Sequence, residues 1–316
     1  MIRHHRDISY TVVVPVYNKA PHLARCLDSI LQQQRQDLEV IAVNDASTDS
    51  SLTVLEDYQH NLPIRIFSRD QPGPGGYAAR NLAIANARSE WIAFLDADDT
   101  WEKGYLTELD ALRRRFPEAD IIGTGYRIID PETQHDHRFT RLNRSGDQRW
   151  ISLNNFIDSY LNRGGCFQTS ATAARRSTLL AAGGFPEKTA RQGGDVDTWL
   201  RCMLVGTGGA WSPSVKMRYH RDAVNQVTAN PDNLRQPHPV ATTAASYAQA
   251  LHDRQQKRLL RRLGNKKGLK RARDAAAAGL YDYILVAELN RFDAVYWLHR
   301  ALLPVKNIVA KGHRFV

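Results

Sequence analysis

Residues 91–101 read WIAFLDADDTW, and this stretch decides the fold. The apolar run at 91–95 predicts a buried strand, because it is too short for a helix and rich in bulky residues. Three acids follow within four positions: Asp96, Asp98 and Asp99. Carboxylates crowded at the end of a buried strand repel one another unless a cation lies among them, and hard ions such as Mg²⁺ or Mn²⁺ suit such a cluster. The alternative is that Asp98 or Asp99 caps a helix over 101–116.

Upstream of this stretch, strand patterns alternate with helical ones. Strands are predicted at 11–16, 38–43 and 63–68, and a helical pattern follows each of them. This alternation predicts a parallel sheet with right-handed crossovers and helices on both faces, and ligands bind beyond the carboxyl ends of such strands. No Gly-x-Gly-x-x-Gly follows the first strand, which argues against a dinucleotide site of the dehydrogenase type.

Four short motifs follow one another along this alternation, three of them at or just after strand ends. They are VVPVYN at 13–18, VNDASTD at 43–49, ARN at 79–81 and FLDADD at 94–99. In this order the motifs resemble family 2 of the glycosyltransferases, which are inverting enzymes of the GT-A fold that use nucleotide-diphospho-sugars. The resemblance covers roughly residues 8–222. It implies a Rossmann-like, mostly parallel sheet flanked by helices.

The resemblance also implies roles for residues at the strand ends. Pro15 and Tyr17 would line the pocket for the base, and Tyr17 can stack on a uracil-like ring. Asp45 would accept the ring N–H of the base, and Asp96 would hold the ribose or reach the metal through water. Asp98 would bind the Mg²⁺ or Mn²⁺ ion that bridges the diphosphate of a UDP-sugar.

Several of these residues have a plainer interpretation. Tyr17 could be an ordinary buried aromatic residue, and Asp45 a turn or cap residue. Arg80 could meet the base or the diphosphate, or it could be an exposed helical arginine. His220 could be a further metal ligand, as a late histidine is in several enzymes of this fold, or a surface or diphosphate-binding histidine.

A second block, GGFPE at 183–187 and GGDVDTWLR at 193–201, concerns the acceptor side. Family members carry a Gly-Gly-Phe turn and then Glu-Asp-x-x-x-Trp-Leu-Arg, in which the aspartate is the general base. That aspartate maps onto Asp195, and Gly194 replaces the glutamate. Inversion requires a carboxylate opposite the leaving diphosphate. Asp195 could instead merely cap a helix, and Asp197 is the second candidate base.

Two alternative functions remain open. The missing glutamate makes a catalytically silent nucleotide-sugar-binding or scaffold protein conceivable. A nucleotidyltransferase of related fold is the other alternative, although the turn after the first strand lacks the expected glycines and basic residue. The chain also lacks the Gln-x-x-Arg-Trp of processive synthases, which favours transfer of a single sugar to a glycan or lipid-linked acceptor in cell-envelope polysaccharide synthesis.

The net charge of +10 is concentrated in one segment. Residues 254–273 hold ten basic and no acidic residues, so the rest of the chain has 33 basic against 33 acidic. A local excess predicts an anionic partner, such as a membrane surface at roughly 1 kcal/mol per basic residue. The segment could also pack on the catalytic domain or on a second subunit in a homo-oligomer. Nucleic-acid binding is not expected, because no binding module is recognisable.

We expect a GT-A catalytic domain over residues 1–225 and a linker with a helical, basic C-terminal region over 226–316. Within that region, residues 241–263 and 274–303 are expected to be helical, the latter with an apolar face. Its members are Val286, Leu289, Phe292, Val295 and Tyr296. Three widely spaced cysteines and the lack of an apolar run of about 20 residues favour a cytoplasmic protein, peripheral on the inner face of the membrane.

Overall fold

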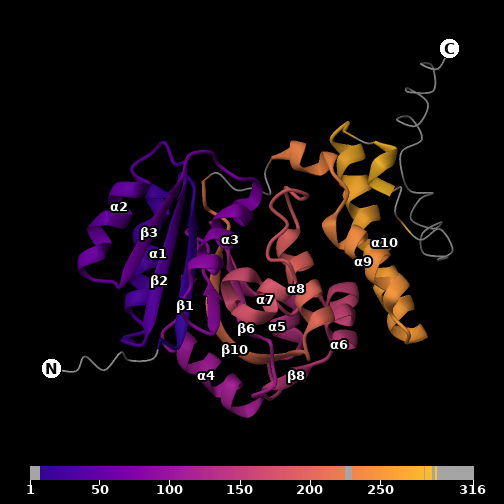
Figure 1. Ribbon diagram of the computed structural model, residues 1–316, viewed down its shortest axis with the longest axis horizontal. Helices are drawn as coiled ribbons and strands as arrows, with labels where there is room; N and C mark the ends of the chain where they lie inside the picture. Colours follow the sequence, from indigo (N-terminus) through magenta and orange to yellow (C-terminus); the bar gives the residue numbers. More distant parts are fainter. Residues whose placement is uncertain (1–7, 225–229, 281, 287–288, 290–316) are drawn as a thin grey trace.

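A computed structural model describes residues 8–224, 230–280, 282–286 and 289. In this part of the chain ten strands form one sheet, with the order β3-β2-β1-β4-β9-β6-β10-β5. Two short strands lie off this path, β7 beside β6 and β8 beside β10. Helices cover both faces of the sheet (Figure 1).

The first half of the sheet is parallel, as the alternation of strands and helices predicts. Its strands are β1 (Tyr10–Val16), β2 (Leu38–Asp45), β3 (Ile64–Arg69) and β4 (Trp91–Phe94). In the second half β6 (Ile121–Ile129) and β10 (Gly209–His220) are parallel to each other. Antiparallel partners complete that half: β5 (Thr100–Trp101), β7 (Gln134–Asp136), β8 (Arg149–Ile151) and β9 (Thr172–Arg175).

The two faces of β1 pack into two different cores. Val12 and Val14 share one core with Leu23 of α1, whereas Val13 shares the other with Trp199 of α8. A strand that is buried on both faces reads as a continuous apolar run, which is why residues 11–16 lack a polar alternation. The helices on the α1 side are α1 (Ala20–Leu31), α2 (Ser51–Asp57) and α4 (Tyr105–Arg115). Those on the α8 side include α3 (Tyr77–Asn86), α6 (Leu153–Asp158), α7 (Arg176–Ala181) and α8 (Gly194–Val205).

Of the two C-terminal helices, α9 (Pro239–Ala250) packs beside α8, and α10 (Arg254–Ala277) packs on α9 and α6 (Figure 1). Val240 of α9 and Leu260 of α10 are fully buried in the same core as Trp199. A Cβ added at Gly264 of α10 would lie 2.7 Å from the Cβ of Ala244, so glycine permits the close approach of the two helices. Within the described ranges, no helix has the length and apolar character needed to cross a bilayer.

Several predicted element boundaries are wrong. The helix predicted over 101–116 begins only at Tyr105, because Thr100 and Trp101 pair with β10 as β5. The polar stretch 130–149 has no strand or helix pattern in its sequence, but it contains β7 and a short helix, α5 (Arg138–Leu142). Short elements with mixed polar residues carry too little periodicity to be recognised.

The C-terminal helices also differ from the prediction. The helix predicted over 241–263 is broken between Ala250 and Arg254, where the Asp253 carboxylate accepts from the Gln256 N–H and begins α10. The one predicted over 274–303 does not form over its first part. There α10 ends at Ala277, Gly279 follows with φ +71°, and Tyr283–Val286 is a 3₁₀ turn. The predicted positions Phe292, Val295 and Tyr296 lie outside the described residues.

Candidate active site

One cavity of about 620 Å³ lies beyond the carboxyl ends of β1, β2 and β4. The start of α8, the end of β10 and the C-terminal half of α10 also line it. Eight of the residues singled out from the sequence line it: Pro15, Tyr17, Asp45, Arg80, Asp96, Asp98, Asp195 and His220. Residues from distant parts of the chain are thus brought together, because carboxyl ends of parallel strands meet at one edge of a sheet.

Asp45 ends β2 and is 1% exposed. Its carboxylate forms an ion pair with Arg69 and accepts a hydrogen bond of 3.0 Å from the Gly73 N–H. These contacts hold the glycine-rich loop against the cavity, where Gly75 and Gly76 both have φ +66°. Tyr17 lies at the same end of the cavity with 42% of its surface exposed, so it is not the buried aromatic of the plainer interpretation.

Arg80 is 6% exposed, so it is not a solvent-facing helical arginine. Its guanidinium forms an ion pair with Asp96 and donates to the carbonyl of Gly75 at 2.8 Å. Its Cζ also lies 5.4 Å from the centre of the Phe185 ring. Arg80 therefore supplies one of the cations that the acidic cluster requires.

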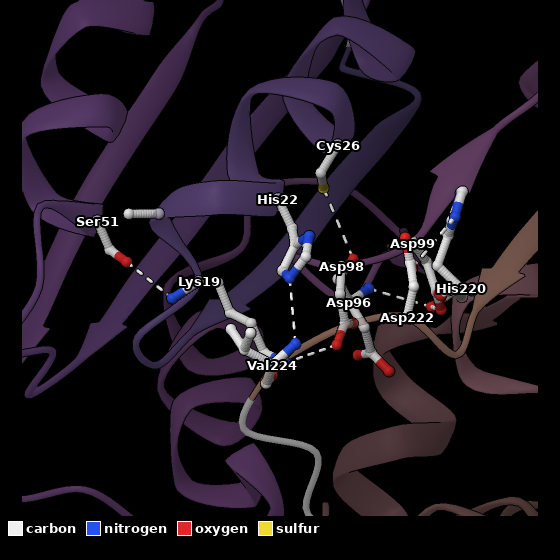
Figure 2. Close-up of polar contacts among 12 residues, drawn as sticks. Lys19, His22, Cys26, Ser51, Asp96, Asp98, Asp99, His220, Asp222 and Val224 are labelled. Carbon is white, nitrogen blue, oxygen red and sulfur yellow. Dashed lines mark hydrogen bonds and ion pairs between the residues drawn. The ribbon is translucent and has the colours of Figure 1, made fainter. Parts of the chain in front are cut away.

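Lys19 supplies a second cation (Figure 2). Its Nζ lies 2.6 Å from Oδ2 of Asp98 and donates to the carbonyl of Val224 at 2.6 Å. Asp99, by contrast, is fully buried and accepts from the Ser170 hydroxyl and the His220 N–H. Burial and the charges of Asp98 and Asp96 raise the pKa of Asp99 well above its usual value. The three acids therefore coexist because two are paired with cations and the third favours its neutral form.

The donor set suits a hard divalent ion only if substrate and water complete its coordination. In the described part of the chain, no group of three His, Cys, Asp or Glu side chains could hold a metal by itself. Asp96 and Asp98 offer carboxylate oxygens, and Mg²⁺ takes one or two of these with phosphate oxygens and water. The Nε2 of His220 lies 3.1 Å from the Thr100 hydroxyl, and its Nδ1 lies 3.8 Å from Asp222. An ion at Asp98 would have to displace Lys19.

The two acids at the start of α8 have different surroundings. Asp195 lines the cavity, is partly exposed, and accepts a weak hydrogen bond of 3.5 Å from the Thr169 hydroxyl. Asp197 is 2% exposed and pairs with Arg201 at 2.8 Å, while the Thr243 hydroxyl donates to its other oxygen. Asp197 is therefore a structural residue, and the accessible carboxylate is that of Asp195.

The position of the missing glutamate is filled by another side chain. The Gly194 N–H donates to the hydroxyl of Tyr77 at 2.9 Å. A Cβ at Gly194 would lie 2.7 Å from both the Tyr77 ring and the Pro186 ring. The first residue of α8 therefore has no room for a side chain here, and Tyr77 occupies the place beside Asp195.

Sequence reasoning missed several residues of the site. Lys19 and Tyr77 carry no motif signal, because their roles depend on helices that only the tertiary fold brings to the acids. Lys267, Lys270 and Arg271 of α10 also line the cavity. Their basic segment stood out in the sequence, but its composition does not say which face of the helix packs inward.

Comparisons with known proteins agree with this architecture. The sequence model of the family described as Glycosyl transferase family 2 matches residues 11–179. Glycosyltransferase GlyA of Streptococcus pneumoniae serotype 4 is 38% identical over 129 residues, which are 40% of this chain and 18% of that protein. An uncharacterized glycosyltransferase of Nostoc sp. is 32% identical over 170 residues, 54% of this chain and 51% of that protein. The matches thus span about half or less of these relatives' own lengths.

Solved structures share the fold at low sequence identity. S. aureus TarS gives a TM-score of 0.69 at 17% identity, covering 95% of this chain and 54% of that one. TarS 1-349 in complex with UDP gives 0.68 at 17% identity, covering 93% and 87%. Mannosyltransferase PcManGT from Pyrobaculum calidifontis, in complex with GDP-Man and Mn²⁺, gives 0.57 at 19% identity, covering 96% and 88%. The expected Rossmann-like GT-A fold is confirmed.

Proposed function

This chain belongs to family 2 of the glycosyl transferases, and we propose that it transfers a single sugar from a UDP-sugar, with inversion, to a hydroxyl of a glycan or lipid-linked acceptor in cell-envelope polysaccharide synthesis. The observation that carries the proposal is that Asp45, Asp98 and Asp195 line one cavity. A sugar nucleotide held at the first two acids can then be reached by an acceptor at the third. The complexes of TarS with UDP and of PcManGT with GDP-Man support nucleotide-sugar binding by this fold.

The base and ribose would bind at the ends of β1 and β2. The exposed ring of Tyr17 offers a face for stacking on uracil, and Pro15 lies at the same end of the cavity. The buried carboxylate of Asp45 can accept the N–H of the base, since it is acceptor-only when ionised. The Arg80–Asp96 pair lies next to this place, where its charges can meet the ribose and the diphosphate.

A Mg²⁺ or Mn²⁺ ion would be held by Asp98, with Asp96 and His220 beside it. When bound, such an ion stabilises the negative charge of the leaving diphosphate. The Mn²⁺ in the PcManGT complex supports this proposal. Lys19 would then release Asp98.

Asp195 would act as the general base. Its carboxylate takes the proton of the acceptor hydroxyl while the hydroxyl oxygen attacks the anomeric carbon. The bond from that carbon to the diphosphate oxygen breaks, and its electron pair leaves with UDP. Attack on the face opposite the leaving group inverts the configuration. Asp197 takes no part, because Arg201 and Thr243 occupy its carboxylate.

We keep the division into a catalytic domain at 1–225 and a C-terminal extension at 226–316 as part of the proposal. The extension would complete the cavity through α10 and dock the protein on an anionic membrane at the inner face of the cell envelope. Arg254, Arg258, Arg261 and Arg262, in the N-terminal half of α10, are exposed and could contact anionic lipid.

The proposal is tested by a thermal-shift screen of UDP-, GDP- and dTDP-sugars with and without Mn²⁺, because a ligand that binds the native state raises the melting temperature. We expect UDP-sugars to give the largest shift and Mn²⁺ to increase it. Tyr17→Ala should abolish most of the shift, whereas Tyr17→Phe should keep it, since stacking needs only the ring. No shift with any nucleotide would contradict the proposal, and tight binding without turnover would favour the silent binding protein.

A further inference from the structure

The C-terminal half of α10 brings positive charge to the cavity. Lys267, Lys270 and Arg271 line it together with Asp195, the second residue of α8. The three residues fall within little more than one helical turn. They come from the segment that carries the whole charge excess of the chain.

Two of these cations already have partners. Arg271 is 4% exposed and donates to the main-chain carbonyls of Gln192, Asn233 and Gln236 at 3.0, 2.9 and 3.2 Å. Carbonyl dipoles hold this guanidinium, and no carboxylate among the described residues lies within ion-pair distance of it. Lys270 pairs with Asp274 at 2.6 Å. Through its hydrogen bond to the Gln192 carbonyl, Arg271 connects α10 to the loop that precedes Asp195.

Lys267 differs from both neighbours. Its ammonium lies 5.0 Å from the centre of the Tyr160 ring, and it is only partly exposed. Among the described residues, no carboxylate lies within ion-pair distance of it and no atom accepts a hydrogen bond from it. Burial, with Lys266 and Lys270, lowers the pKa of Lys267 to about 8, and Asp195 opposes this lowering. A partly buried ammonium on a cavity wall is stabilised by an anion brought into the cavity.

The position of Lys267 shows which substrate could bring that anion. The places proposed for the base and diphosphate lie at the ends of β1, β2 and β4. Lys267 is close enough to Asp195 for the charge of that acid to raise its pKa, and Arg271 of the same helix donates to Gln192, three residues before Asp195. An anion at Lys267 would therefore belong to the molecule that Asp195 deprotonates.

We propose that Lys267 binds a phosphate group of the acceptor, so that the acceptor is a phosphate-bearing polyol, glycan or lipid. This inference rests on the proposed function, since it assumes that the acceptor binds beside Asp195. A lysine ammonium binds phosphate as a point charge, and the Arg271 guanidinium, which could bind phosphate in a bidentate manner, already donates to main-chain carbonyls. The charge of Arg271, four residues further along α10 and also lining the cavity, adds to the local positive field.

The test measures phosphate binding by the full chain saturated with UDP and Mn²⁺, so that the donor site is closed to the probe. Two probes are titrated by calorimetry: sn-glycerol 3-phosphate, which resembles a polyol phosphate, and farnesyl diphosphate, which resembles a lipid carrier. Glycerol serves as the neutral counterpart. We expect binding of at least one phosphate probe and none of glycerol, and the stronger probe identifies the source of the phosphate.

Three variants decide the assignment. Lys267→Met should weaken phosphate binding about tenfold, as loss of one charge-assisted contact does, whereas Lys267→Arg should largely retain it. Lys257→Met, about 15 Å away along the same helix, loses the same charge and should bind as wild type. Equal affinity in Lys267→Met and wild type, or no binding of either probe by wild type, would overturn the inference. Absence of UDP binding in every form would instead contradict the proposed function, and the comparison of variants would still report on Lys267.

Discussion

The ammonium of Lys19 lies 2.6 Å from Oδ2 of Asp98, the acid proposed to bind the metal. A lysine at the start of α1 thus occupies the place where a divalent ion would bind. The pair is part-buried, with side-chain exposures of 12% and 17%. Lys19 and Arg80 thus balance charge on Asp98 and Asp96, and a metal that binds Asp98 must compete with Lys19.

This competition predicts that Lys19→Met lowers the Mn²⁺ concentration needed for half-maximal UDP binding. A part-exposed ion pair contributes about 1 kcal/mol, which corresponds to roughly a fivefold change. The measurement is calorimetric titration of UDP at a series of Mn²⁺ concentrations. Lys103→Met, at an exposed lysine outside the cavity, is the matched control and should leave the requirement unchanged. An unchanged or higher requirement in Lys19→Met would contradict competition.

Mutation of the two acids of α8 should have different effects, one on catalysis and the other on stability. Asp195→Asn should lower kcat for UDP release from the donor sugar by about a thousandfold, while UDP affinity and melting temperature stay close to wild type. Asp197→Asn should instead lower the free energy of unfolding by about 3 kcal/mol, because it breaks a buried ion pair with Arg201. Turnover that persists in Asp195→Asn would show that the base lies elsewhere.

The contact of Gly194 with Tyr77 predicts a coupled pair. Gly194→Ala should cost about 1–3 kcal/mol, because its Cβ would collide with the Tyr77 and Pro186 rings. In the Tyr77→Ala background the same change should cost less, since one of the two obstacles is gone. A denaturant-based double-mutant cycle measures this difference. If the two substitutions changed the free energy of unfolding additively, the Cβ at position 194 and the Tyr77 ring would not compete for the same space.

A histidine in the cavity predicts acid sensitivity. His137 lines it, stacks on Tyr126 and begins α5, and burial together with His135 and Arg141 lowers its pKa to about 4. The imidazole of His137 therefore binds a proton more readily in the unfolded chain than in the folded one. The free energy of unfolding is unaffected by this group above about pH 6.5 and falls as the pH drops toward 4.

His137→Asn keeps a side chain that can cap α5 but cannot titrate. Between pH 7 and pH 4.5 it should lose about 1 kcal/mol less stability than wild type, a figure reduced for the partial exposure of the ring. Chemical denaturation at both pH values gives the comparison. Identical losses in the two proteins would assign the acid sensitivity to other groups.

Docking on an anionic membrane is testable without deleting α10, whose Leu260 belongs to the main core. Replacing Arg258, Arg261 and Arg262 with glutamine should weaken sedimentation with vesicles rich in anionic lipid, while UDP affinity stays unchanged. The exposed control Arg114→Gln lies on α4. Unaltered sedimentation of the triple variant would exclude this half of α10 as the docking surface.

The motifs at strand ends were predictable because chain order and strand polarity together place them. Asp45, Asp96 and Asp98 each follow a recognisable buried strand, and parallel strands bring their ends to one edge. A buried strand can be recognised from its own apolar composition, without knowing which strands it pairs with. This is why the first half of the sheet and the acids of the cavity could be derived from the sequence.

Contacts between distant side chains could not be derived in the same way. Tyr77 fills the space beside Gly194 across 117 positions of sequence, and no local pattern marks either residue for the other. The basic residues of α10 face both solvent and cavity, so their charge alone did not indicate that Lys267 lines the site. Packing of this kind depends on which helix faces meet.

The most direct test of the account is a crystal structure of the protein with UDP and Mn²⁺. We predict the uracil ring beside Tyr17 and Asp45, the diphosphate facing Asp98, and Asp195 open to solvent across the cavity from the diphosphate. A nucleotide bound elsewhere, or bound here with its diphosphate turned away from Asp98 and Asp195, would contradict the central claim.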